Sequence, residues 1–301
     1  MNKNVRQILL PLIASFIWGS AFIFQKQASN ADIGAFTYNA LRSIVAAVVL
    51  AIIILIKNSI SEKRLTFKIK HSKEYKKDLL IGGTICGICL TCAVNLQQYA
   101  LYTSTAGKAG FLTALYIVLV PLLSIFLKKK VSFSGCIAVI LACFGLYFLC
   151  IKNNFSIVLP DILLLLCALF FSIHIITVSH YSLKVDGFEL SCFQFVFCFI
   201  TSSIIALFFE GPLTISIIKD CYLSILYVGI FSSAIGYTLQ ILAQKGTNPT
   251  VVSLIMSLEA FFSTVLGAIM LNEILTRKEY IGCILMLAAV LISQVPSKKS
   301  I

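Results

Sequence analysis

The chain has 301 residues, of which 59% are apolar and only 12% are charged, and its formal net charge is +12. A soluble domain carries about 25% charged residues, so this composition excludes a protein that covers its whole surface against water. The basic residues lie in short gaps between apolar runs, which argues against nucleic-acid binding and for a lipid bilayer as the solvent.

Ten apolar segments are long enough to cross a bilayer as helices, since a span needs about 20 residues. The first segment is longer than the apolar region of a signal peptide and is interpreted as a retained span. Several connections are very short, so neighbouring spans must run antiparallel. The sequence therefore predicts an all-α integral membrane protein with about ten transmembrane helices. The predicted spans are residues 8–28, 36–56, 79–101, 106–127, 131–150, 158–180, 188–209, 221–243, 249–271 and 278–295.

Most of the 24 Lys and Arg residues fall in alternate connections between the spans. By the positive-inside rule, this pattern predicts that these connections and both termini are cytoplasmic. The longest hydrophilic stretch, Lys57–Asp78, is rich in Lys and lacks apolar periodicity. It is typical of a solvated cytoplasmic loop that sets topology, with a regulatory or lipid-contacting role as the alternative.

Cys and Gly residues recur at helical spacing within the apolar runs, without a His or carboxylate beside them to complete a metal site. We interpret these groups as helix-packing positions and expect neither a metal ion, a disulfide nor a nucleotide-binding loop. They are Cys86, Cys89 and Cys92; Cys136, Cys143 and Cys150; and Gly82, Gly83 and Gly87.

The chain resembles itself at a shift of about 143–154 residues. Residues 14–18 align with residues 168–172 and residues 36–42 with residues 188–194, while residues 96–100 align with residues 239–243 at the shorter shift. Each half holds five spans, and an odd number means that the second half enters the membrane upside down. The sequence therefore predicts two inverted-topology repeats, residues 1–150 and residues 156–296, which suits alternating access.

The segment Thr247–Thr276, which contains Glu259 and Glu273, resembles the C-terminal repeat of the EamA family in the drug/metabolite transporter superfamily. The first half agrees in Trp18-Gly-Ser-Ala-Phe22, in Arg42, in Tyr102–Thr113 and in Val120-Pro-Leu122. Two positions depart from the family pattern. Ala260 follows the first glutamate where the family usually has Pro, and Lys128-Lys-Lys130 stands where the first repeat often has Gly-Glu.

This resemblance implies a ten-span carrier, commonly an exporter or importer of amino acids or other metabolites, with a central cavity between its halves. It also implies residence in a bacterial inner membrane. No cofactor is expected, and the oligomeric state, monomer or homodimer, stays open.

Two charged residues, Arg42 and Glu259, lie well away from the ends of their predicted spans, where charges are expensive and usually functional. Glu259 is about ten residues, or roughly 15 Å, into its span, near the midplane, and no other carboxylate is placed so deeply. It is a candidate for substrate binding and for proton coupling, and the alternative is a residue that locks helix packing. Arg42 lies roughly 9 Å from the outer edge of its span. It is a candidate for binding a substrate carboxylate, and the alternatives are snorkelling or structural pairing.

Two spans carry a polar face at helical spacing, and polar faces in lipid must point at protein or water. We expect these faces to line the cavity and assign Asn95, Gln98, Tyr237 and Gln240 to substrate binding, with interhelical hydrogen bonding as the alternative. The two faces are Thr91, Asn95, Gln98 and Tyr102, and Ser233, Tyr237, Gln240 and Gln244.

Three further residues complete the candidate site. Trp18 lies in mid-span, away from the interfacial belt where Trp is common, and Tyr116 matches Glu259 in the repeat. Both are aromatic candidates for substrate binding, with ordinary core packing as the alternative. His174 is a candidate proton relay or a packing histidine.

The sequence favours a secondary transporter of a small metabolite, most simply an amino acid or a related compound. An exporter of cationic or aromatic drug-like compounds is the alternative, and a carrier of nucleotide-like metabolites is a third option. An intramembrane enzyme needs paired catalytic groups at matched depth, and only one deep carboxylate is present, so an enzyme is not expected.

Overall fold

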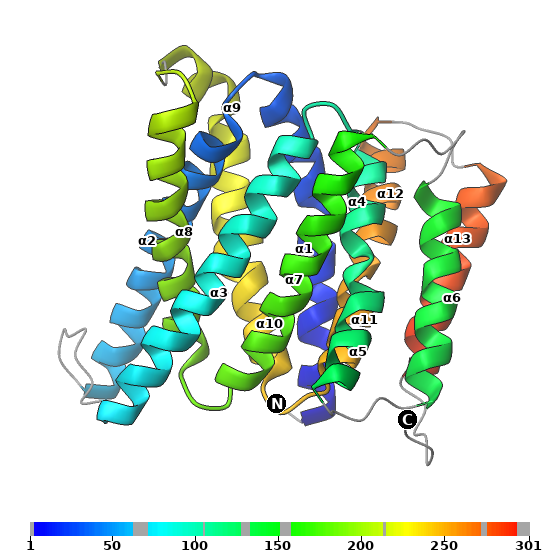
Figure 1. Ribbon diagram of the computed structural model, residues 1–301, viewed down its shortest axis with the longest axis horizontal. Helices are drawn as coiled ribbons and strands as arrows, with labels where there is room; N and C mark the ends of the chain where they lie inside the picture. The colour runs from blue at the N-terminus through cyan, green and yellow to red at the C-terminus, as the bar shows by residue number, and fades with distance from the viewer. Residues whose placement is uncertain are drawn as a thin grey trace.

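The computed structural model describes residues 3–62, 72–104, 106–127, 133–150, 158–212, 215–271 and 276–293. In these residues the chain forms a bundle of roughly aligned helices (Figure 1). The first half contains α1 (Lys3–Asn30), α2 (Ala35–Glu62), α3 (Lys73–Ala100), α4 (Ala106–Ala114), α5 (Tyr116–Phe126) and α6 (Phe133–Cys150). The second half contains α7 (Leu159–Tyr181), α8 (Gly187–Phe209), α9 (Ile215–Tyr227), the π-helix η1 (Val228–Gly236), α10 (Tyr237–Gln244), α11 (Pro249–Met256), α12 (Leu258–Leu271) and α13 (Arg277–Ser293).

The predicted fold class is confirmed. Within the described residues, eight helical segments are long and apolar enough to cross a membrane, and the apolar segment Phe133–Phe148 and helix α13 complete ten spans. Large apolar side chains are exposed on the outward faces of these helices, for example Phe126, Leu207 and Phe209. Such surfaces suit contact with lipid.

Three predicted spans differ from the structure in their interior. Spans four and nine each consist of two helices, divided at Leu115 and at Ser257, and span eight starts at Ile215 and contains η1. A hydropathy pattern does not reveal such breaks because the residues on both sides of them are apolar. In lipid, irregular backbone is tolerated only where it is buried in protein or faces a cavity, so the breaks indicate the centre of the molecule.

The Lys-rich stretch Lys57–Asp78 is more ordered than predicted. Helix α2 continues to Glu62 and helix α3 begins at Lys73, while residues 63–71 lie outside the described part of the chain. The Ser72 side chain accepts a hydrogen bond from the Tyr75 backbone N–H and so caps α3. Polar residues extend both helices beyond their apolar sections, which is why hydropathy ended the second span too early and began the third span too late. Lys128, Lys129 and Lys130 also lie outside the described residues.

The helix contacts have the symmetry of an inverted repeat. Helices α2 and α8, which are spans two and seven, pack together at one side of the bundle. Helices α6 and α13, which are spans five and ten, pack together at the opposite side (Figure 1). The contact of α3 with α7 corresponds to that of α1 with η1 and α10, and the contact of α1 with α12 corresponds to that of α7 with α4 and α5. Exchanging the two halves therefore maps each of these pairings onto itself or onto another observed pairing.

The predicted glycine packing positions lie where α3 meets α7 and α8. A Cβ atom at Gly87 would lie 2.7 Å from Phe197 Cδ1, and one at Gly82 would meet the ring of Tyr181. The absence of a side chain lets the helix backbones approach closely.

Substitution of Gly87 tests this packing. We expect Gly87→Ala to destabilise the protein by about 1–3 kcal/mol, because the added methyl group overlaps the Phe197 ring. The matched control is Gly211→Ala, since a Cβ at Gly211 has no atom within 4 Å. Thermal unfolding in detergent measures both variants. Equal melting temperatures for the two would contradict the role of Gly87.

Candidate functional site

A cavity lies between the two halves, with about 470 Å³ of space not occupied by protein atoms, including space that is open to solvent. Spans one to four and six, eight and nine contribute side chains to its wall. Six of the residues selected from the sequence line it: Trp18, Arg42, Tyr116, Tyr237, Gln240 and Glu259. The cavity thus lies at the interface between the repeats, where inverted-repeat transporters place their sites.

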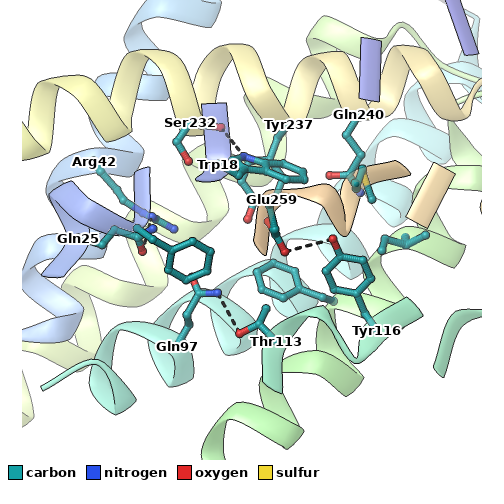
Figure 2. A pocket seen from close by; sticks show the side chains of 14 residues that line it. Trp18, Gln25, Arg42, Gln97, Thr113, Tyr116, Ser232, Tyr237, Gln240 and Glu259 are labelled. Atoms are coloured by element: carbon teal, nitrogen blue, oxygen red, sulfur yellow. Dashed lines mark hydrogen bonds between the residues drawn. The ribbon is translucent and has the colours of Figure 1, made fainter. Parts of the chain in front are cut away.

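The breaks in spans four and nine bring two of these residues together. Tyr116 is the first residue of α5 and Glu259 is the second residue of α12, so each follows directly on a break. The Tyr116 hydroxyl donates a hydrogen bond to Glu259 Oε1 at 3.1 Å (Figure 2). The Ser257 hydroxyl donates to the Leu254 backbone carbonyl at 2.7 Å, a bond of the kind that bends helices. The repeat shift predicted that Tyr116 and Glu259 correspond, but it did not predict that they touch.

Glu259 is nearly enclosed, with 5% of its surface exposed. Among the described residues, the Tyr116 hydroxyl is its hydrogen-bond donor, and no ion pair joins it to a basic side chain. A carboxylate can accept about four hydrogen bonds. Glu259 therefore has accepting capacity left on the side that faces the cavity.

Arg42 is equally enclosed, with 2% of its surface exposed. Its Nη1 atom lies 3.5 Å from Gln25 Oε1, a long hydrogen bond, and its Nε atom has no partner. In the part of the chain that the structure describes, no carboxylate comes within ion-pair distance of it. A guanidinium group carries five N–H donors, so most of its capacity is unused. Figure 2 shows Arg42 directed into the same cavity as Glu259.

The predicted polar face of span eight lines the cavity only in part. Tyr237 and Gln240 do so, but Ser232 lines it in place of Ser233. Helix η1 is wider than an α-helix, which changes the register of the residues that precede Tyr237. Gln244 lies beyond the cavity and donates a hydrogen bond to the Ile175 backbone carbonyl at 3.1 Å.

The predicted polar face of span three does not line the cavity, which corrects the expected placement of Asn95 and Gln98. Asn95 accepts a hydrogen bond from Asn39 at 2.9 Å and donates one to Ser202 at 2.9 Å. Gln98 donates to the Gln25 backbone carbonyl and to the Ser29 hydroxyl. These contacts are the interhelical bonds that were the alternative interpretation.

Gln97 is the residue of span three that faces the cavity, and it donates a hydrogen bond to the Thr113 hydroxyl at 3.3 Å. Adjacent residues on a helix point about 100° apart, so an error of one residue turns a side chain away from the cavity. The repeat alignment of Gln97 with Gln240 was the signal for its position. The other lining residues that sequence reasoning missed are Phe22, Gln25, Thr113, Phe171, Ile175, Ser232 and Met256.

His174 lies behind the cavity wall. It is fully buried, its Nε2 atom is 2.9 Å from Gln194 Oε1, and its ring meets the Tyr237 ring edge-on at 6.0 Å. The two interpretations for His174 were a proton relay and a packing histidine, and these contacts are packing contacts. Tyr237 contacts the His174 ring and itself lines the cavity.

The site offers polar and aromatic groups rather than metal ligands. Within the described ranges, no group of three or more His, Cys, Asp or Glu side chains could hold a metal ion. The cavity instead combines one cation, one carboxyl group, several amides and a wall of aromatic rings. Such a surface can bind a small molecule that carries charged and apolar groups.

Tyr102 lies outside the membrane-spanning segments, in the connection between spans three and four. Its hydroxyl donates to the Ile33 backbone carbonyl. Burial raises the pKa of Tyr102 to about 12, and the nearby Glu210 and Asp32 act in the same direction. The hydroxyl therefore keeps its proton, and this hydrogen bond persists, throughout the physiological pH range.

Comparisons with known proteins agree with this architecture. The chain is 32% identical to an uncharacterized transporter of Archaeoglobus fulgidus over 286 residues, which cover 93% of this chain and 83% of the relative. It is 23% identical to an uncharacterized transporter of Clostridium kluyveri over 229 residues, 72% of each chain. A solved crystal structure superposes over 96% of both chains with a TM-score of 0.76 at 14% identity, which shows the shared fold alone.

The EamA-like transporter family matches the sequence twice, over residues 5–151 and over residues 158–294. Each match covers five of the spans described above, and together they cover nearly the whole chain. This protein is a multi-pass membrane transporter of the EamA-like family, in the drug/metabolite transporter superfamily.

Proposed function

We propose that the protein is a secondary transporter that moves a zwitterionic metabolite, an amino acid or a related compound, by alternating access. The observation that carries this proposal is the pair of unlike charges in one cavity. Arg42 and Glu259 both line it, and neither is paired with the other or with another charged group of the described residues. Buried charges are stable when they are paired, so a ligand that brings a carboxylate to Arg42 and an ammonium group to Glu259 completes both.

The alternatives fit this cavity less well. A cationic or aromatic drug-like compound would suit Glu259 and the rings of Trp18 and Tyr237, but it would leave Arg42 as an unpaired charge. A nucleotide-like metabolite would need more positive charge than Arg42 supplies, and Glu259 would repel its phosphates. A zwitterion satisfies both groups at once.

Proton coupling is proposed for Glu259. A carboxyl group inside a cavity can take up a proton when the cavity opens to one side and release it on the other. Tyr116 holds the carboxyl group at 3.1 Å and fixes its direction. His174 would act on Glu259 only through the intervening Tyr237 ring, so we assign it an indirect role at most.

We propose that residues 1–150 and residues 156–296 are the two repeats, which the double family match supports. The beginning of α1 and the end of α13 lie at the same end of the bundle (Figure 1). The distribution of Lys and Arg favours the cytoplasm for that side, and we propose the bacterial inner membrane as the location. Whether the protein acts as a monomer or a homodimer is left open by this mechanism.

Alternating access requires contacts that close each end of the cavity in turn, and α1 supplies one at each end. Lys26 donates hydrogen bonds to the backbone carbonyls of Leu101 and Ser104, at 2.6 and 3.2 Å, near the end of span three. Arg6 donates to the Lys245 carbonyl at 2.7 Å, at the end of span eight. Spans three and eight correspond in the repeat, and twenty residues of α1 cover about 30 Å, the thickness of the hydrocarbon core.

Removing either cavity charge tests the zwitterion. We expect Arg42→Gln to raise the KM for a transported amino acid by about tenfold to hundredfold, because a charge-assisted hydrogen bond contributes about 1.5–3 kcal/mol. The corresponding decarboxylated amine should be unaffected by this change. Glu259→Gln should impair both compounds, and counter-flow in proteoliposomes measures each rate.

Two exposed residues offer matched controls for these charges. Lys219→Gln removes a positive charge and Asp220→Asn removes a negative charge from the surface, and both should transport normally.

A pH gradient imposed on wild-type vesicles should accelerate uptake, and Glu259→Gln should abolish that acceleration. Undiminished transport of every amino acid by Glu259→Gln would contradict both the ammonium site and the proton site.

Binding can be followed by fluorescence because Trp18 is the single Trp of the chain and lies in the cavity wall. We expect a transported amino acid to change the emission of the purified protein in a saturable way, since the ligand replaces water beside the indole. Arg42→Gln should shift the midpoint of the titration to higher concentration. An uncharged sugar serves as the control ligand, and the same response to sugar and amino acid would argue against a specific site.

The two α1 contacts predict opposite changes in access. Gln97→Cys and Gln240→Cys place a thiol on each side of the cavity, in a background without other reactive cysteines. We expect Lys26→Gln to increase labelling of Gln97→Cys by an impermeant maleimide from the outer face by roughly fivefold, the factor for about 1 kcal/mol. Arg6→Gln should do the same for Gln240→Cys from the cytoplasmic face. If each variant changed both positions equally, the contacts would not be side-specific.

A further inference from the structure

The two repeats differ at the position of Trp18. The alignment of residues 14–18 with residues 168–172 places Ser172 opposite Trp18. Ser172 is fully buried, donates its hydroxyl proton to the Ala168 carbonyl at 2.7 Å and does not line the cavity. Trp18 does line the cavity, so one repeat presents an indole ring to it where the other repeat has a buried serine.

The indole ring is held in place by a hydrogen bond from its N–H group and by contact with a second aromatic ring. Its Nε1–H donates a hydrogen bond to the Ser232 backbone carbonyl at 3.2 Å, and its ring lies 5.0 Å from the Tyr237 ring (Figure 2). Ser232 belongs to the π-helix η1, and π-helical segments of this kind are frequent at functional sites. The ring is therefore a fixed part of the wall and not a mobile side chain.

Gly236 determines how far the ring sits from the cavity centre. A Cβ atom at this position would lie 2.7 Å from Trp18 Nε1 and 3.3 Å from Cε2. Gly236 lies against the Nε1 edge of the indole and does not itself line the cavity. Any larger residue would overlap the indole ring and displace it, and the cavity that Trp18 lines is unfilled space beside the ring. Apolar Phe171 and Ile175 also line the cavity and complete its wall.

We propose that Trp18, seated against Gly236, is a specificity-determining residue that limits the size of the substrate's apolar group. This inference rests on the proposed function, in which Arg42 and Glu259 hold the two charges of a zwitterion. The remaining space then accepts the side group, and the indole ring bounds it. The carrier accordingly favours α-amino acids with aliphatic side chains over those with aromatic ones.

Four proteins test the size limit: the wild type, Trp18→Phe, Gly236→Ala and the double variant. Counter-flow in proteoliposomes with labelled alanine, leucine and phenylalanine gives the rate for each. We expect Trp18→Phe to raise the phenylalanine-to-alanine ratio by about tenfold, the lower end of what one group in an apolar pocket contributes. Gly236→Ala should lower the leucine-to-alanine ratio. The double variant should return toward the wild type, because the smaller ring makes room for the added methyl group.

These ratios separate a size limit from a structural defect, which would lower all three rates in parallel. Ratios that stay the same in all four proteins would overturn the proposal, as would a change of the same sign in Trp18→Phe and Gly236→Ala. A fall in every rate for Gly236→Ala that Trp18→Phe does not correct would also count against it.

Failure of the proposed function gives a different result. If none of the three amino acids exchanges, ligand-induced shifts in melting temperature are measured with n-alkylamines and n-alkanoic acids of graded length. A length limit that moves to longer chains in Trp18→Phe would retain the size filter and reject the amino acid class. A length limit that is equal in all four proteins would reject the filter itself.

Discussion

Two unlike charges that are buried in a membrane protein, and are unpaired among the described residues, constrain the rest of the structure. A charge in lipid is costly, so Arg42 and Glu259 persist only where protein and a polar cavity surround them. The break at Ser257 directs Glu259 inward, and the Tyr116 hydroxyl supports it. The long spans around them carry their polar groups toward one another and their apolar groups toward lipid. The helices are therefore arranged so that they enclose a polar cavity.

The frame around this cavity is symmetric and its chemistry is not. Tyr116 corresponds to Glu259 and Ser172 corresponds to Trp18, so each pair offers different groups to a ligand at equivalent places. A symmetric frame gives two equivalent packings, which alternating access needs. An asymmetric wall gives a ligand one preferred orientation. Both properties fit a repeated helix frame whose two copies present different side chains to the cavity.

Hydropathy was sufficient to predict the ten spans because each apolar run is long and its ends are polar. The depth of Glu259 and Arg42 followed from counting residues along a helix. The rotation of α3 about its own axis could not be predicted by counting, because its polar residues face α2 and α8 as well as the cavity. Gln97 and Gln98 differ by one position, and only Gln97 lines the cavity. Helix η1 and the break at Leu115 left no signal, because the residues there are apolar or small in any case.

The symmetry of the helix frame also bears on how the carrier can move. The contacts of Lys26 and Arg6 lie at opposite ends of one helix and hold corresponding spans, so releasing either leaves the other in place. Glu259 and Arg42 line the cavity that lies between these ends. In the mechanism proposed above, a ligand that neutralises both charges removes the main electrostatic reason for water to enter the cavity. Under that proposal, occupation of the site favours closure at both ends, which is the state from which either end can open.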